Sequence, residues 1–171
     1  MDILITPFFD YLYNKWFTES IIQLDIEAFG INNCWNIDNF YKDLPLKKEL
    51  SLISSQNGKV TGYLIGSSYE ASGGLTAHLN RIAVRNDNRN KGTGLKLLEN
   101  FESNAKKYCC RHITLEFDNK LHVSRFYEKA GYLPINRKAD ILNYLKAKRK
   151  EKLKDIYLNF DRNIYFKYII D

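Results

Sequence analysis

Several features that would assign a protein to a membrane, a secretory route or a modular architecture are missing from this 171-residue sequence. No uninterrupted apolar run exceeds three residues, which is far too short for a membrane-spanning helix. The N-terminus carries Asp2 and Asp10, where a secretory signal would be basic and then continuously apolar. No internal repeat or low-complexity linker interrupts the chain. We therefore expect one soluble, cytoplasmic domain over residues 1–171, with no membrane partner.

Residues that commonly bind metals or form disulfides are also scarce. The three cysteines, Cys34, Cys109 and Cys110, have no metal-ligand spacing, and two of them are adjacent, which is a strained geometry for a disulfide. The three histidines are isolated, without the i, i+4 partner of a helical metal site. We expect reduced cysteines that pack as small apolar groups, and no metal.

The sequence is rich enough in apolar residues to fold, and its charge is concentrated late in the chain. Apolar residues make up 44%, aromatic residues 14% and charged residues 27%, a balance typical of a globular protein. The net charge is +6, and residues 137–155 account for +5 of it through eight basic and three acidic side chains. The basic character therefore belongs to one segment, and the rest of the chain is close to neutral.

The pattern of elements is that of an α/β protein. Helical spacing dominates the first 50 residues, and Gly30 ends the first helix. The turn dipeptide Asn57-Gly58 separates two strands and indicates a hairpin. The later expected elements are a strand at 75–84, a helix from Gly92, a strand at 113–117, a helix at 121–130, a strand at 132–135, a helix at 139–154 and a strand at 163–170. Strand, glycine turn, helix and strand in this order predict a parallel crossover.

The first candidate site is the sequence between the buried strand and its following helix, formed by Arg89, Asn90, Lys91, Gly92, Thr93 and Gly94. Glycines let an anion approach the backbone, and the first N–H groups of a helix point toward it. We interpret this loop as a pyrophosphate cradle. The alternative is a flexible glycine loop that only caps the helix.

The second candidate site is Ser124–Tyr132, which reads SRFYEKAGY on a short helix after the second parallel strand. Together, the two passages resemble the GCN5-related N-acetyltransferase (GNAT) superfamily, whose coenzyme loop reads Arg/Gln-x-x-Gly-x-Gly/Ala and whose later helix reads Phe-Tyr-Glu-Lys-x-Gly-Phe/Tyr. The LNRIAV stretch and the first helices are similar to the ribosomal-protein N-terminal acetyltransferase branch. The resemblance implies a central mixed, mostly antiparallel sheet splayed between two parallel strands and flanked by helices, with a basic helical insertion before the last strand.

The resemblance also implies how acetyl-CoA, the cosubstrate, is bound. Ile82, Ala83 and Val84 match the strand that pairs with the pantetheine arm, near a bulge that frees an N–H for the thioester oxygen. A coenzyme-binding asparagine usually lies seven residues before the helix tyrosine, but Lys120 occupies that position here and Asn119 precedes it. Asn119 serves as the contact if the loop is one residue shorter.

Two residues match catalytic positions of the superfamily. Tyr127 matches the general acid that protonates the coenzyme thiolate, and a phenol of ordinary pKa near 10 is chemically suited to that step. Glu116 matches a glutamate that acts as general base on the acceptor amine. The alternatives are that Tyr127 only packs and that Glu116 is a solvated strand residue. Neither Cys109 nor Cys110 falls in a matching position, so the resemblance implies direct attack in a ternary complex.

The inserted segment, residues 137–160, is the main departure from the superfamily. Its apolar positions are interrupted by the run Lys146–Lys152, so only its ends are expected to dock. It is either a solvated helix face or a patch for an anionic partner such as RNA or an acidic peptide.

We therefore expect an acetyl-CoA-dependent N-acetyltransferase acting on a primary amine, first of all a protein N-terminus, with a lysine or a small-molecule amine as other acceptors. The alternatives are a toxin that acetylates aminoacyl-tRNA and a non-catalytic module that binds acyl-CoA or nucleic acid through the basic segment.

Overall fold

The structure is a computed structural model that describes residues 3–11, 14–159 and 161–169. Within these residues, seven strands form one mixed sheet in the order β1-β2-β3-β4-β5-β7-β6. Strands β4 and β5 are parallel, whereas the pairs β1–β2, β2–β3, β5–β7 and β6–β7 are antiparallel. The strands are β1 (Leu4–Pro7), β2 (Leu52–Gln56), β3 (Lys59–Ala71), β4 (Gly74–Val84), β5 (His112–Asp118), β6 (Leu133–Pro134) and β7 (Arg162–Tyr168). This confirms the predicted α/β class and its mixed sheet.

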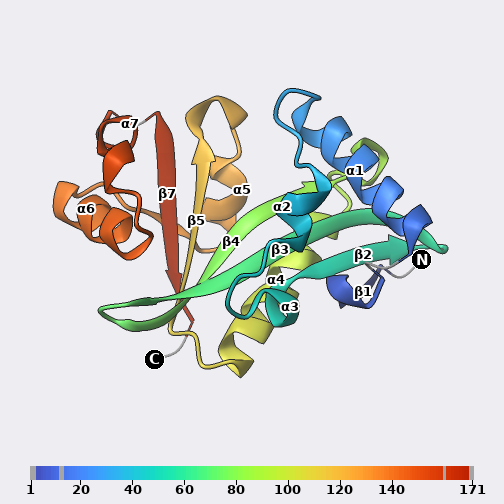
Figure 1. Cartoon of the computed structure of the whole chain (residues 1–171), viewed down its shortest axis with the longest axis horizontal. Coiled ribbons are helices and arrows are strands. Elements are labelled where there is room, and N and C mark those ends of the chain that lie inside the picture. The colour runs from blue at the N-terminus through green and yellow to red at the C-terminus, as the bar shows by residue number, and fades with distance from the viewer. Residues whose placement is uncertain (1–2, 12–13, 160, 170–171) are drawn as a thin grey trace. The chain divides into compact units, whose positions relative to one another are not determined.

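The helices lie between the strands along the chain, and from β2 onward the elements come in the predicted order (Figure 1). The α-helices are α1 (Lys15–Phe29), α2 (Ile37–Tyr41), α3 (Lys47–Leu50), α4 (Thr93–Lys107), α5 (Ser124–Lys129), α6 (Lys138–Ala147) and α7 (Lys154–Leu158). Short 3-10 helices are η1 (Phe8–Tyr11), η2 (Asn86–Asn88), η3 (Asn119–Leu121) and η4 (Glu151–Leu153). None of the helices in the described ranges is both long and apolar enough to cross a membrane.

The chain forms two compact units, which we describe one at a time. The first unit comprises Met1–Ser67 and Asn80–Asn104, and the second comprises Ser68–Leu79 and Ala105–Asp171. Strands β3 and β4 each contribute residues to both units.

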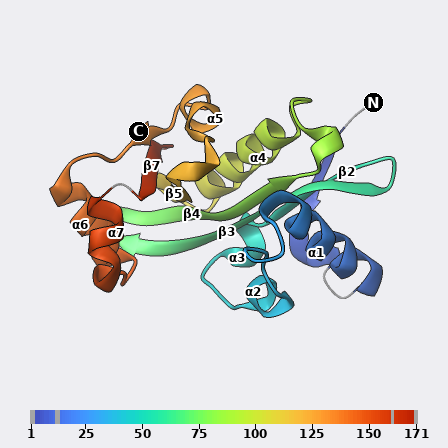
Figure 2. The same cartoon turned by 90° about the horizontal axis from the view of Figure 1, so that it is seen from above.

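The core of the first unit is built by the alternation of side chains along β3. Tyr63 and Ile65 are fully buried in a cluster with Leu24 of α1 and Phe40 of α2. The glycines of β3 allow α4 to pack closely on this strand: a Cβ at Gly66 would lie 2.5 Å from the Phe101 ring of α4. Helices α1 and α2 thus lie on one side of the strands of this unit, and α4 lies on the other (Figure 2).

The second unit is organised around the two faces of β5. Phe117 is buried on one face, where its ring stacks on Tyr127 of α5 with ring centroids 5.5 Å apart. Glu116 points to the opposite face, where it meets Tyr144 of α6 and Tyr157 of α7. Helices α6 and α7 lie together beside β7 (Figure 1).

Three expectations need correction. Residues Leu4–Pro7 form an antiparallel strand on β2, although helical spacing was expected throughout the first 50 residues. The single helix expected at 139–154 is interrupted after Ala147, because Arg149 adopts a left-handed conformation with φ of 53°. The closing strand spans Arg162–Tyr168, and residue 170 of the expected range lies outside the described residues.

Candidate active site

The loop before α4 has the backbone geometry that a phosphate cradle requires. It follows η2, and both Asn90 (φ 59°) and Gly92 (φ 84°) adopt left-handed conformations. The Lys96 N–H donates to the Gly92 carbonyl at 2.9 Å, so the helical hydrogen bonds begin at Gly92. The Thr93 hydroxyl, which is buried, donates to the Asn88 carbonyl at 3.3 Å and ties the loop to the start of the helix.

The exposed groups of this loop suit a polyanion. A Cβ placed on Gly92 would find no atom within 4 Å, so the backbone is open to an approaching group. Arg89, Asn90 and Lys91 are all exposed around it. The first N–H groups of α4 lack helical partners and carry the positive end of the helix dipole. The loop therefore offers exposed backbone and cationic side chains to an anion, and its role as a pyrophosphate cradle stays a prediction.

The strand segment Ile82–Val84 leads directly into this loop. Ala83 is buried, whereas Ile82 and Val84 are half-buried. The Arg85 N–H donates to the Thr61 carbonyl of β3 at 2.9 Å, and the Arg89 Nε donates to the Val84 carbonyl at 3.1 Å. The end of β4 is thus held to both β3 and the loop. Pairing of this segment with a pantetheine arm stays a prediction.

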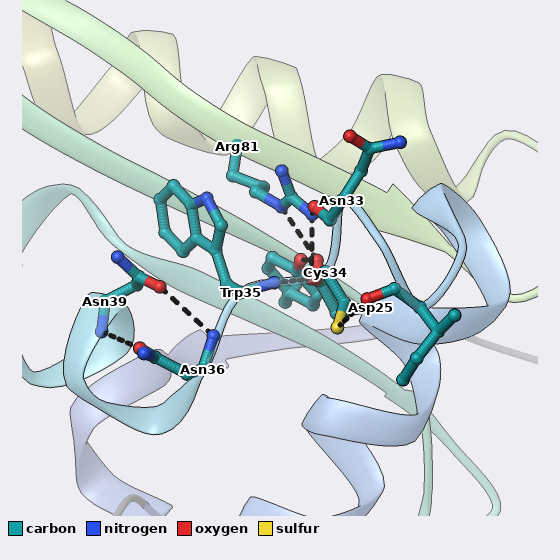
Figure 3. A network of polar contacts seen from close by, with 9 residues as sticks. Asp25, Asn33, Cys34, Trp35, Asn36, Asn39 and Arg81 are labelled. Carbon is teal, nitrogen blue, oxygen red and sulfur yellow. Dashed lines mark hydrogen bonds and ion pairs between the residues drawn. The ribbon is translucent and has the colours of Figure 1, made fainter.

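A buried ion pair next to this strand was not predicted from the sequence. The Asp25 side chain on α1 is fully buried, and it accepts two hydrogen bonds of 2.7 Å from the Nε and Nη2 groups of Arg81 on β4 (Figure 3). It also accepts from the Trp35 backbone N–H and the Tyr63 hydroxyl. Burial and the Asp25 charge raise the pKa of Tyr63 well above its usual value, so this phenol stays a donor.

Arg81 extends the network to the loop between α1 and α2. Its Nη2 also donates to the Asn33 carbonyl at 2.8 Å, and its guanidinium lies 3.6 Å from the centre of the Phe29 ring. Asn36 then caps α2 by a reciprocal pair of hydrogen bonds with Asn39 (Figure 3). One ion pair therefore connects α1 and this loop to β4, next to its segment Ile82–Val84.

Tyr127 lies on α5 in the second unit and is almost completely buried. It stacks on Phe117 and meets Tyr132 edge to face. None of the residues that the structure describes forms a hydrogen bond with its hydroxyl. Burial raises the pKa of Tyr127, so the phenol is protonated at neutral pH. The same rise makes it a weaker acid than an ordinary phenol, and its role as general acid stays a prediction.

Glu116 is held by several donors. Its Oε2 accepts hydrogen bonds of 2.8 Å from both Tyr144 and Tyr157, and its Oε1 accepts one from Lys150. The Arg162 guanidinium lies 3.6 Å from Oε1. Burial alone would raise its pKa, but the Lys150 charge and these hydrogen bonds outweigh that effect and lower the pKa to about 2. With 11% of its side chain exposed, Glu116 is not the solvated strand residue of the alternative interpretation.

The middle of the inserted segment is docked, contrary to the expectation that only its ends would be. Lys150 binds Glu116, and Lys148 Nζ lies 4.6 Å from the centre of the Tyr69 ring. Burial and the neighbouring Lys150 lower the pKa of Lys148 to about 8. Lys146, Arg149 and the basic residues of η4 and α7 remain exposed.

Asn119 begins η3 directly after β5. Its backbone N–H donates to the Asp161 carbonyl at 3.3 Å, and its side chain is exposed. Lys120, at the usual asparagine position, is also exposed, and its N–H donates to Asp118. A coenzyme contact by Asn119 stays a prediction.

The predicted residues thus fall into two sets. Ile82–Val84 and Arg89–Gly94 lie in the first unit, and Glu116, Asn119 and Tyr127 lie in the second. In the described residues, no group of three His, Cys, Asp or Glu side chains could hold a metal ion. The cysteines are free thiols.

The sequence profile of the acetyltransferase (GNAT) family matches residues 15–132, so the chain belongs to this family. Membership supports acetyl transfer from acetyl-CoA in general terms. No curated protein matches the sequence.

Solved structures with the same fold include N-terminal acetyltransferases. The ribosomal-protein-S18-alanine N-acetyltransferase from Escherichia coli is 18% identical with a TM-score of 0.69, over 99% of this chain and 96% of its own. Ard1 from Thermoplasma volcanium is 17% identical with a TM-score of 0.70 over 100% of both chains. Arabidopsis thaliana Naa50, in complex with the bisubstrate analogue CoA-Ac-MVNAL, is 16% identical with a TM-score of 0.67, over 98% of this chain and 99% of its own. At these identities the likeness establishes the fold.

Proposed function

We propose that the protein transfers the acetyl group of acetyl-CoA to a primary amine, and that its preferred acceptor is the amino terminus of a protein or peptide. The observation that carries the proposal is the open, cationic loop at the start of α4, where Gly92 leaves the backbone accessible to a pyrophosphate. The structural neighbours whose names refer to ribosomal protein S18 and to a peptide analogue support a peptide acceptor.

In this proposal the loop binds the pyrophosphate and Ile82–Val84 orients the pantetheine arm. The acceptor amine attacks the thioester carbon directly, the C–S bond breaks, and Tyr127 donates its proton to the departing thiolate. A backbone N–H of the β4 segment stabilises the oxyanion. The tyrosinate then recovers a proton from solvent or from the acceptor ammonium.

The contacts of Glu116 bear on its proposed role as base. A carboxylate with a pKa of about 2 is a weak proton acceptor. Its four partners instead favour a role as the anchor that holds the inserted segment on the acceptor side. If Glu116 is the base, Glu116→Gln lowers kcat and removes the acidic limb of the pH profile. If it is the anchor, the same variant lowers stability and raises the KM of the acceptor.

Thiol release from acetyl-CoA with a panel of peptides, polyamines and other amines tests the proposal. We expect turnover with at least one peptide, and a loss of about a hundredfold or more in kcat for Tyr127→Phe with an unchanged dissociation constant for coenzyme A. Tyr108→Phe, which changes a half-buried tyrosine directly after α4, is the matched control and retains activity. Coenzyme binding without turnover on any amine would refute the proposed acetyltransferase activity and favour a non-catalytic binding module.

A further inference from the structure

A pocket of about 330 Å³ lies on the Glu116 face of the second unit, beside the inserted segment. It is formed by the end of the β3–β4 hairpin, β5, β7 and α6. Tyr69, Tyr144, Phe166 and Tyr168 contribute aromatic rings to its walls, and Thr114 contributes a hydroxyl. Its size is at the lower end of the range for ligand pockets, which suits one ring rather than a coenzyme.

Three of the four aromatic rings are held by contacts with neighbouring side chains. The Tyr144 hydroxyl donates to Glu116 at 2.8 Å, and the Tyr69 hydroxyl lies 3.1 Å from Thr114 Oγ1. The Tyr168 ring packs edge to face on His112 with centroids 4.8 Å apart. Because Tyr69, Tyr144 and Tyr168 each have a partner of their own, these three rings keep their spacing without a ligand, and little ordering is needed when one binds.

A buried histidine supports the same walls from behind. His78 Nδ1 lies 3.0 Å from Thr114 Oγ1, and its ring meets those of Tyr69 and Tyr144 at 6.2 and 6.3 Å. Burial lowers the pKa of His78 well below its usual value. The neutral ring therefore acts as a spacer between the two tyrosines.

We propose that this pocket binds one aromatic side chain of the acceptor peptide and so sets specificity; this rests on the proposed function. Aromatic walls favour a planar ring through edge-to-face and offset contacts. Tyr144 connects the pocket to the candidate site, because its ring lines the pocket while its hydroxyl binds Glu116. Thr114 and Glu116 are two residues apart on the same face of β5, a separation of about 7 Å. A ring in the pocket therefore contacts β5 at Thr114, two residues from Glu116.

Filling the pocket from α6 tests the inference. Asn143 and Ala147 both line the pocket from successive turns of this helix, so Ala147→Phe or Asn143→Phe would occupy it. The matched control is Lys146→Phe, which adds the same side chain at the neighbouring exposed position. Circular dichroism and thermal melting of each variant show whether the fold is kept.

The assay is kcat/KM for acetylation of peptides in which one phenylalanine is scanned through an otherwise aromatic-free sequence. We expect one position to raise kcat/KM by about tenfold or more. Both filling variants should abolish this advantage and leave the value for the aromatic-free peptide within about twofold, whereas Lys146→Phe should keep the advantage. An absence of any positional advantage, or its persistence in both filling variants, overturns the inference.

Failure of the proposed function gives a different result. If no peptide is acetylated, saturation-transfer NMR with phenol as the probe decides whether the pocket accepts a ring. A signal with the wild-type protein and Lys146→Phe that disappears in Ala147→Phe supports the pocket as a ring site, although the acceptor is then not a peptide. No signal with the wild-type protein overturns the inference.

Discussion

Replacing Arg81 by methionine tests whether the ion pair with Asp25 holds the first unit together. Methionine keeps much of the apolar contact of the arginine stem and removes the charge. Asp25 is then left with the Trp35 N–H and the Tyr63 hydroxyl as donors, in a site where its side chain has no exposure to water. Removing one partner of a buried ion pair costs about 3–5 kcal/mol, because the remaining charge stays desolvated.

The expected loss of about 3–5 kcal/mol corresponds to a fall in Tm of roughly 6–20 °C for a chain of this size. Urea denaturation and thermal melting measure it. The control is Arg137→Met, since Arg137 forms a similar 2.7 Å contact with Asp140 but is 84% exposed. That exposed pair should contribute less than about 1 kcal/mol.

A double-mutant cycle isolates the interaction free energy of the Asp25–Arg81 pair. The variant Asp25→Asn/Arg81→Met removes both charges, so it should be more stable than the sum of the two single changes predicts. Hydrogen exchange should show faster opening at Asn33 and Trp35 in Arg81→Met, because Arg81 and Asp25 fix this loop. A loss in Arg81→Met no larger than that of Arg137→Met would refute the reasoning.

Three further predictions follow from the loop, from Glu116 and from the basic segment. Gly92→Ala and Gly58→Ala both force alanine to adopt a positive φ, so each should cost about 1–2 kcal/mol of stability. Only Gly92→Ala should weaken coenzyme A binding in calorimetry. Equal binding by the two variants would contradict the role of this loop as a pyrophosphate cradle. The pKa of Glu116 is lowered from 4.5 to about 2, so its contacts stabilise the fold fully above about pH 5, and this contribution is lost as the pH falls toward 2. Acid titration of Glu116→Gln should lack that loss of stability. A titration identical to that of the wild type would exclude the role of Glu116 as an anchor. If RNA binds the exposed cations, Lys146→Gln/Arg149→Gln removes two of them and should reduce the slope of log affinity against log salt by roughly 1.4–1.8. An unchanged slope would place the RNA elsewhere.

Elements with strong local signals could be predicted from the sequence. The Asn57-Gly58 turn has both residues at positive φ, as the hairpin requires. Gly30 and Gly131 follow helices at positive φ, which is why they mark helix ends. Strand β1 was missed because it is short and is stabilised by pairing with β2, almost 50 residues away in the sequence.

The contacts of charged residues with partners far along the chain could not be predicted from the sequence. Asp25 lies in the apolar stripe of α1, and a carboxylate in such a stripe signals a buried cation, but Arg81 is 56 residues further along the chain. The run Lys146–Lys152 interrupts the apolar positions of the inserted segment, so the sequence predicts an undocked stretch, either solvated or bound to an anionic partner. The left-handed turn at Arg149 instead places Lys148 against Tyr69 and Lys150 against Glu116.

These contacts constrain what Glu116 can do in catalysis. An ionised carboxylate has about four lone-pair sites, and Tyr144, Tyr157 and Lys150 occupy three of them. An acceptor ammonium that approached Glu116 would meet the Lys150 ammonium on the same carboxylate, and the two like charges would repel each other. Proton transfer would also cancel the charge that holds Lys150. The base role therefore requires Lys150 to leave Glu116, whereas the anchor role requires it to stay, so the two roles exclude each other in any one state of the protein.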